Sequence, residues 1–318
     1  MFNNSSINTF SVANTSPLHI IITVMNVILI LLITVGNSFT IMAITRFRNL
    51  RHQSSVMIGA LAMADVSMGV AYTPVKLFRT HVPYLFRLEM PCLIAMYIGH
   101  LAALAAIIFL SLLSLERFYA IQFPFHYHAH ATVKVAVIVN VAVFIFIASA
   151  LVPLFAGAAM WYDGVSCYAP TLYPSLYTRF IVAVAAIPLF LGFVGFIRVC
   201  VAEFRFRKQV FDQSVASLRK QESIRSKLII TAYVVSLCFW VPHMLYYLYD
   251  TVSKADQNVY LFRIVTLLDV GSSAVNCFLY AWKNSKFKTA YRELWGLKPS
   301  TEAIRPFTTN TVSLSHPL

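Results

Sequence analysis

Seven long, mostly apolar stretches divide this sequence. They are residues 18–45, 53–79, 90–121, 132–155, 174–204, 220–250 and 258–282. A helix needs about 20 largely apolar residues to cross the hydrocarbon of a bilayer. Stretches 18–45 and 135–162 contain no Asp, Glu, Lys or Arg, whereas Asp269 interrupts the seventh. The sequence therefore predicts an all-α membrane protein with seven transmembrane helices over residues 18–282.

The composition supports a membrane location. Of the 318 residues, 59% are hydrophobic and only 12% are charged, whereas soluble domains carry about 25% charged residues. The net charge of +13 comes mostly from short basic runs between the apolar stretches. Such runs are typical of cytoplasmic loops and not of a groove for nucleic acid. We therefore expect membrane lipids, and no nucleic acid, among the partners.

Basic residues also predict the orientation of the chain. Only six of the 25 Lys and Arg residues lie on the side of the N-terminus; they are Lys76, Arg79, Arg87, Arg179, Lys254 and Arg263. The rich side is expected in the cytoplasm. Residues 1–17 would then be extracellular and residues 298–318 a cytoplasmic tail. Glycosylation sequons at Asn3, Asn4 and Asn14 agree weakly with this orientation, because such motifs are common by chance.

The connections between the stretches are short. None exceeds roughly 25 residues, which leaves no room for a soluble catalytic domain, and we find no phosphate-binding loop or metal-ligand cluster. We therefore expect no enzyme activity, cofactor or metal. A transporter or channel is a further possibility, but no inverted repeat is visible. Basic and apolar residues alternate at helical spacing within 283–297, which predicts a short amphipathic helix on the inner membrane surface.

Several polar side chains fall inside the apolar stretches. They are Asn37, Asp65, Glu116, Arg117, Asp269 and Asn276. Polar groups at membrane depth are costly and often mark function. The alternative is that each one hydrogen-bonds a neighbouring helix and serves packing alone.

The local sequences around these residues resemble the rhodopsin-like (class A) family of G-protein-coupled receptors over nearly the whole chain. The matching motifs are Gly36-Asn37, Leu61 to Asp65, Glu116-Arg117-Phe118, Pro188, Phe239-Trp240-Val241-Pro242 and Asn276-Cys277-Phe278-Leu279-Tyr280. The resemblance implies a plasma-membrane receptor that binds an extracellular ligand and activates a heterotrimeric G protein. It also implies a disulfide between Cys92 and Cys167, the alternative being two free thiols.

The same resemblance implies a conformational switch. Arg117 would be held at rest by Glu116 and by Glu222, which lies about 30 Å along its helix from Pro242. Agonist would move the inner end of the sixth helix about a pivot at Trp240 and Pro242. The alternative is that Glu222 is simply a solvated charge in a basic loop.

A polar core is implied near the middle of the membrane. Asp65 and Asn276 would face each other there, with Asn37 in the first helix and Tyr280 one turn beyond Asn276 as a further part of the switch. Family members often hold a sodium ion at this place. In this chain the third helix offers Ala106 where a polar residue is usual, so we assign no metal.

Some positions depart from the family pattern. Phe118 and Phe196 stand where tyrosines are common, Ser236 replaces a phenylalanine, and Cys277 replaces a proline. Two of these departures remove hydroxyl groups that stabilise the active state in relatives. A non-signalling or chemosensory-type binding receptor therefore remains an alternative.

The expected ligand pocket lies in the outer third of the bundle. Its candidate polar residues are His100, His243, Tyr247, Thr266 and Asp269. Gly99 occupies the position of the aspartate that binds amines in relatives, and the seventh helix has no lysine for a retinal Schiff base. Lys76 and Arg79 would either meet an anionic group or extend to lipid headgroups. Short outer loops favour a small molecule or a short peptide as the ligand.

Overall fold

The structure is a computed structural model that describes residues 17–162, 167, 172–207, 213–253 and 259–297. Within 213–228 it describes the course of the helix but not the side chains. Asn3, Asn4, Asn14 and the tail 298–318 lie outside the described residues, and so does the side chain of Glu222.

Seven helices in the described part of the chain are long and apolar enough to cross a membrane. In chain order they are α2 (Pro17–Arg46), α3 to α4 (Gln53–His81), α5 (Glu89–Gln122), α7 with the short η4 (Val133–Leu154), α9 (Ser175–Arg207), α10 (Gln213–Ser253) and α11 (Val259–Lys283). The predicted seven-helix membrane fold is confirmed. The main difference is at the sixth helix, which begins seven residues earlier than its apolar stretch.

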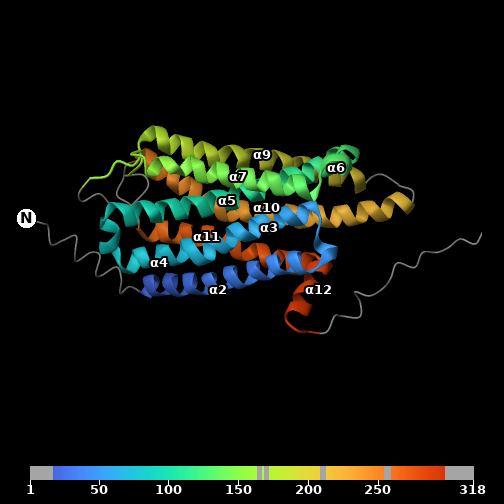
Figure 1. Cartoon of the computed structure of the whole chain (residues 1–318), viewed down its shortest axis with the longest axis horizontal. Coiled ribbons are helices and arrows are strands. Elements are labelled where there is room, and N and C mark those ends of the chain that lie inside the picture. The colour runs from blue at the N-terminus through green and yellow to red at the C-terminus, as the bar shows by residue number, and fades with distance from the viewer. Residues whose placement is uncertain (1–16, 163–166, 168–171, 208–212, 254–258, 298–318) are drawn as a thin grey trace, which may run out of the picture.

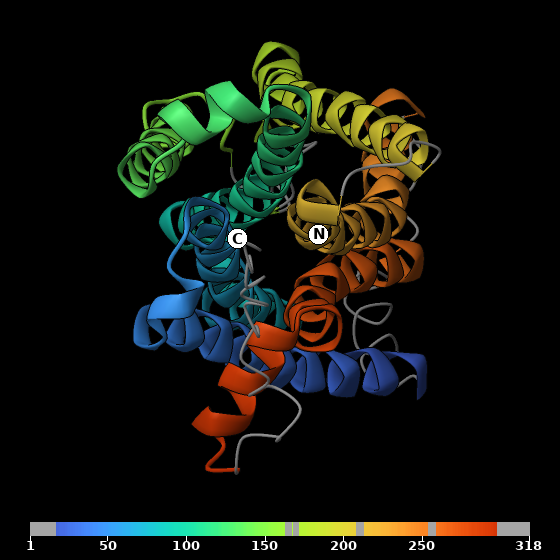
Figure 2. The same cartoon turned by 90° about the vertical axis from the view of Figure 1, so that its right-hand side faces the viewer.

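The seven helices run side by side along the bundle (Figure 1), and Figure 2 shows them from one end. Helix α5 contacts α3, α7, α9 and α10, and most of its apolar window is buried. By contrast, only 22% of the apolar windows of α2 and α7 are buried inside the protein. Because large apolar side chains cover their exposed faces, these two helices suit a lipid surrounding.

The second membrane helix contains a local change of geometry. A π-helical turn, η2 (Met68–Tyr72), separates α3 (Gln53–Ser67) from α4 (Thr73–His81), and Pro74 follows it in the first turn of α4. A π turn inserts one extra residue, which rotates everything after it by about 100° around the helix axis. The side chains of α4 therefore face a different direction from the one that a regular helix would give them.

A short helix, α12 (Ser285–Leu294), packs across the end of the bundle at α2 and α11. Asn284 caps it by accepting a hydrogen bond from the backbone N–H of Lys286 at 3.0 Å. Phe287 is buried, and the ring of Trp295 stacks on Phe39 of α2 with centroids 5.2 Å apart. This helix is the short amphipathic helix expected within 283–297, and its location on the inner membrane surface stays a prediction.

Candidate functional site

A cavity of about 150 Å³ opens between α4, α5, α9, α10 and α11. It lies towards the bundle end that carries the disulfide, opposite the end with α6 (Pro124–His130) and α12. Five residues singled out from the sequence line it together: His100, His243, Tyr247, Thr266 and Asp269. Most of the remaining wall is apolar, formed by residues such as Leu104, Ile107, Ile181, Met244 and Phe262.

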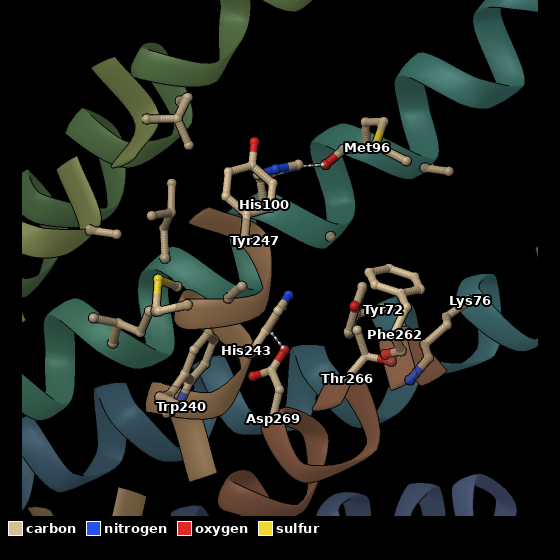
Figure 3. A pocket seen from close by; sticks show the side chains of 18 of the residues that line it. Tyr72, Lys76, Met96, His100, Trp240, His243, Tyr247, Phe262, Thr266 and Asp269 are labelled. Atoms are coloured by element: carbon tan, nitrogen blue, oxygen red, sulfur yellow. Dashed lines mark hydrogen bonds and ion pairs between the residues drawn. The ribbon is translucent and has the colours of Figure 1, made fainter. Parts of the chain in front are cut away.

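The polar side of this cavity is formed by α10, α11 and α4 (Figure 3). His243 Nδ1 lies 3.1 Å from Oδ2 of Asp269, which is fully buried. The second carboxylate oxygen, Oδ1, is also buried and has no hydrogen-bond partner among the described residues. The hydroxyl of Thr266 already has a partner, because it donates a hydrogen bond to the carbonyl oxygen of Phe262 at 2.9 Å. Asp269 therefore has spare hydrogen-bonding capacity on the cavity wall.

Lys76 belongs to the same cavity, although it stands near the end of its helix. Its side chain is only 9% exposed, and Nζ donates a long hydrogen bond of 3.5 Å to Oδ1 of Asn26 in α2. The π-helical turn one helical turn earlier sets this direction. Lys76 thus points into the bundle. The sequence left two possibilities for this residue, a position that faces an anionic group or extension to the lipid headgroups, and the burial of Lys76 argues against the second.

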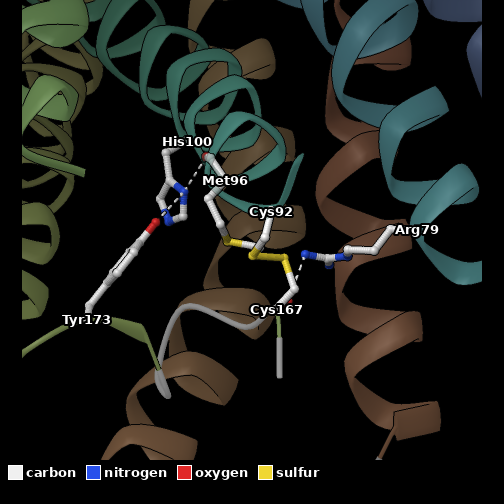
Figure 4. The surroundings of a disulfide bond; sticks show 6 residues. All are labelled: Arg79, Cys92, Met96, His100, Cys167 and Tyr173. Carbon is white, nitrogen blue, oxygen red and sulfur yellow. Dashed lines mark hydrogen bonds between the residues drawn. A yellow bond between two sulfur atoms is a disulfide. The ribbon is translucent and has the colours of Figure 1, made fainter. Parts of the chain in front are cut away.

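The disulfide Cys92–Cys167 is present, with Cα atoms 5.7 Å apart, and it ties the segment after α7 to the start of α5 (Figure 4). Arg79 strengthens this attachment by donating to the carbonyl oxygen of Cys167 at 3.2 Å. Arg79 thus contacts the disulfide-bonded segment and, like Lys76, also lines the cavity.

His100 is oriented by its own helix. Its Nδ1 lies 2.8 Å from the carbonyl oxygen of Met96 and 3.4 Å from the hydroxyl of Tyr173 (Figure 4). Burial raises the pKa of the Tyr173 hydroxyl well above its ordinary value, so the hydroxyl stays protonated at neutral pH. His100 is thus mainly a wall residue held in place by a backbone hydrogen bond.

Gly99 permits a close approach that sets the shape of the cavity. A Cβ atom at this position would lie 3.1 Å from the ring of Tyr72, which comes from the π-helical turn. The aromatic ring therefore occupies the space beside α5 that a larger side chain at position 99 would need. The absence of an aspartate at position 99 and the position of the Tyr72 ring belong to the same packing arrangement, because the ring fills the space that an aspartate side chain would need.

Trp240 connects the cavity with the middle of the bundle. Its indole is almost fully buried, lines the cavity and stacks on His243 with ring centroids 6.2 Å apart. Pro242 lies two residues further along α10. A group that enters the cavity would therefore press on the segment of α10 that contains this proline.

Beyond Trp240 lies a buried polar core. Asn276 donates a hydrogen bond to Oδ2 of Asp65 at 2.9 Å, and Asn37 donates to the backbone carbonyl of Ser273 at 3.1 Å. Oδ1 of Asp65 and the hydroxyl of Tyr280 are buried without a partner among the described residues. Unpaired buried polar atoms of this kind are where ordered water is usually found.

We tested the core for the sodium ion that the resemblance suggests. Asp65 supplies a spare carboxylate oxygen, and buried oxygens of Ser273 and Asn276 are also unpartnered in the described part of the chain. Ala106 of α5 is buried and supplies no oxygen. The donor set is thus incomplete on the side of α5, and we assign no ion to it.

The opposite end of the bundle holds Arg117, which is 2% exposed. Its Nε donates to Oε2 of Glu116 at 2.6 Å, and its Nη2 hydrogen-bonds the hydroxyls of Ser54 and Tyr127, the latter at 3.0 Å. Tyr127 and Ser54 also donate to Oε1 of Glu116. We call these four residues the arginine cluster.

The arginine cluster is fixed by three elements, namely α3, α5 and α6. Burial and the nearby Glu116 carboxylate raise the pKa of Tyr127 to about 12, so its hydroxyl remains a donor at neutral pH. Sequence reasoning identified Glu116 and Arg117 but missed Ser54 and Tyr127. The available signal was weak, because Ser54 is one of several small polar residues at the start of α3 and Tyr127 lies in the seven-residue helix α6. The expected contact with Glu222 falls on a side chain that the structure does not describe.

Comparison with known proteins agrees with this architecture. The sequence pattern of the family described as "7 transmembrane receptor (rhodopsin family)" matches residues 36–280, about three quarters of the chain. The human motilin receptor is 30% identical over 91 residues, which cover 28% of this chain and 22% of that receptor. The local match spans far less than the whole relative. The family match, by contrast, runs from the first membrane helix to the seventh, and the chain belongs to the rhodopsin family of seven-transmembrane receptors.

Proposed function

We propose that this protein binds a small extracellular ligand in the cavity beneath the disulfide and, in response, activates a heterotrimeric G protein at the arginine end. In this proposal the N-terminus is extracellular and the C-terminus cytoplasmic. The basic residues on the side of α6 and α12 support that orientation.

The arginine cluster is the observation that carries the proposal. Arg117 is buried although it is charged, and its hydrogen bonds come from three separate elements. A buried charge is stable only while its partners stay in place. The cluster therefore acts as a latch, and a partner that offers new acceptors to Arg117 would compete with Glu116.

Helix α5 links the latch to the cavity. Gly99 lines the cavity and Arg117 stands 18 residues later on the same helix, which is about 27 Å away. Helix α10 also lines the cavity through Trp240 and His243 and contains Pro242 next to them. A ligand that binds better to one arrangement of α5 and α10 shifts the population of that arrangement.

A direct test measures nucleotide exchange on purified heterotrimeric G proteins with the receptor in lipid nanodiscs. We expect exchange above that of empty nanodiscs, and we expect Arg117→Ala to remove the excess. Lys134→Ala is the matched control, because Lys134 is an exposed cation at the same end of the bundle. No excess with any class of G protein, or equal excess for Arg117→Ala, would overturn the proposal.

A receptor that binds without signalling is the second candidate. Its support is the substitution pattern around the switch, where Phe196 stacks on Tyr233 without a hydroxyl of its own and Cys277 follows Asn276. The same exchange assay separates the two candidates, since a binding-only receptor gives no excess in the presence of a bound ligand.

A further inference from the structure

Two buried side chains that can carry opposite charges, Lys76 and Asp269, face the cavity. Lys76 is 9% exposed and Asp269 is fully buried, and both line the cavity wall. Within the described residues the two side chains form no ion pair with each other. Figure 3 shows them at separate points of the wall, with Thr266 between them in this view.

Each of the two groups has hydrogen-bonding capacity that the described residues do not use. The Lys76 ammonium can donate three hydrogen bonds, but in the described part of the chain it makes one, a long contact of 3.5 Å to Asn26. Asp269 uses Oδ2 for His243 and leaves Oδ1 unpaired. Since a buried charge without its partner is destabilising, both groups favour a ligand that supplies the missing partners, namely an acceptor for Lys76 and a donor for Asp269.

The complement of this pair is a molecule that carries both charges. Lys76 requires an acceptor of negative charge, and Asp269 requires a donor, best met by a protonated amine. A purely anionic ligand would leave Oδ1 of Asp269 buried and unpaired. A purely cationic ligand would leave Lys76 unpaired.

The rest of the wall specifies the remainder of the ligand. Apart from Arg79 and the polar residues already described, the lining is apolar and includes Leu104, Ile107 and Ile181 of α5 and α9. A cavity of about 150 Å³ accepts an apolar group of about the size of benzene. The charged part of the ligand would thus lie towards α4 and α11, with an apolar side chain directed at α5 and α9.

We infer that the cavity binds a small zwitterion of the amino-acid type with a large apolar side chain, its carboxylate at Lys76 and its ammonium at Asp269. The inference rests on the proposed function, because it gives that function a ligand class. It does not require that G-protein activation occur.

The test uses matched compounds on the full receptor in nanodiscs, without G protein. The probes are phenylalanine, phenylalaninamide, which lacks the negative charge, phenyllactate, which has a hydroxyl in place of the ammonium, and hydrocinnamate, which has neither donor. The same four types are tested with the leucine side chain. Binding is measured by the concentration at which each compound raises the unfolding temperature, since a ligand of the folded state stabilises it.

We expect at least one of the two zwitterions to bind at least tenfold more tightly than its three analogues. Lys76→Met should weaken the zwitterion at least tenfold and leave the amide within twofold. Asp269→Asn should weaken the zwitterion likewise and leave hydrocinnamate or its leucine counterpart within twofold. Lys134→Met and Glu89→Gln, which change exposed charges of the same signs, are the matched controls.

Several results would overturn the inference. One is that neither zwitterion stabilises the receptor at 10 mM, and another is that an analogue with a single charge binds as tightly as the zwitterion. Loss of binding to the analogues together with the zwitterion in Lys76→Met would show damage to the cavity and would also count against the pairing. Because no G protein is present, these results are independent of the nucleotide-exchange assay, which alone tests coupling.

Discussion

Gly36 and Cys277 fit together so closely that no side chain can be added at Gly36: a Cβ atom there would lie 2.3 Å from Sγ of Cys277. The pair lies where α2 approaches α11, next to Asn37, whose side chain crosses between the two helices. The cysteine that replaces the family's proline is thus accommodated by the glycine opposite it.

Gly36→Ala should destabilise the receptor. Overpacking of a well-packed interior costs about 1–3 kcal/mol, and we expect a clear fall of the unfolding temperature in detergent. Adding Cys277→Ala removes the 2.3 Å clash and leaves a 3.1 Å one, so the double variant should recover part of the loss. Gly59→Ala is the control, because its Cβ would meet Ile44 at an ordinary 3.6 Å. Equal unfolding temperatures for Gly36→Ala and Gly59→Ala would contradict the packing described.

Tyr127→Phe should raise basal nucleotide exchange. The substitution removes the hydroxyl that accepts from Arg117 and donates to Glu116. Hydrogen bonds to charged groups contribute about 1.5–3 kcal/mol. Because the lost hydrogen bonds stabilise the resting state in this proposal, the substitution should increase the population of the open latch at least several-fold. Tyr119→Phe removes a hydroxyl that bonds His126 instead and serves as the control. An unchanged or lower basal rate for Tyr127→Phe would argue against a resting latch.

The latch should not depend on the ionisation of Tyr127 at ordinary pH. Its pKa is raised to about 12, so the neutral phenol persists well above pH 9. We therefore expect the ratio of basal exchange between Tyr127→Phe and the native receptor to stay constant from pH 6.5 to pH 9. A ratio that falls towards one as the pH rises through this window would mean that the hydroxyl ionises earlier.

Asn276→Ala should lower the unfolding temperature. It leaves Oδ2 of Asp65 without its partner at 2.9 Å, and an unsatisfied buried acceptor costs about 1–3 kcal/mol. Asn140→Ala is an informative control, because both amide atoms of Asn140 are buried without a partner among the described residues. That variant should be neutral or stabilising. A larger loss for Asn140→Ala than for Asn276→Ala would refute the role of the Asp65 contact.

Much of the architecture could be predicted because it is determined by continuous segments of the sequence. Long apolar stretches with few charges specify the membrane helices, and alternating basic and apolar residues specify α12. Cys92 and Cys167 could be paired through the family resemblance. His243 and Asp269 were each identified as polar residues at membrane depth, although their direct contact needed the structure.

Other features have no local signature. One extra residue in the turn Met68–Tyr72 leaves the apolar pattern nearly unchanged, yet it decides where Lys76 points. Helix α6 has only seven residues, too few for a periodic pattern. Ser54 and Tyr127 belong to the arginine cluster because segments that are separate in the sequence contact each other there, and a single sequence does not reveal such contacts.

The turn Met68–Tyr72 also suggests how ligand preference could change in related genes. Removing a single codon within it would restore regular helical geometry and rotate α4 by about 100° around the helix axis. Lys76 would then no longer line the cavity, whereas Asp65 and the inner part of the helix would keep their positions. One short deletion could thus remove the carboxylate anchor that we propose at Lys76, whereas point substitutions would have to change the wall residue by residue.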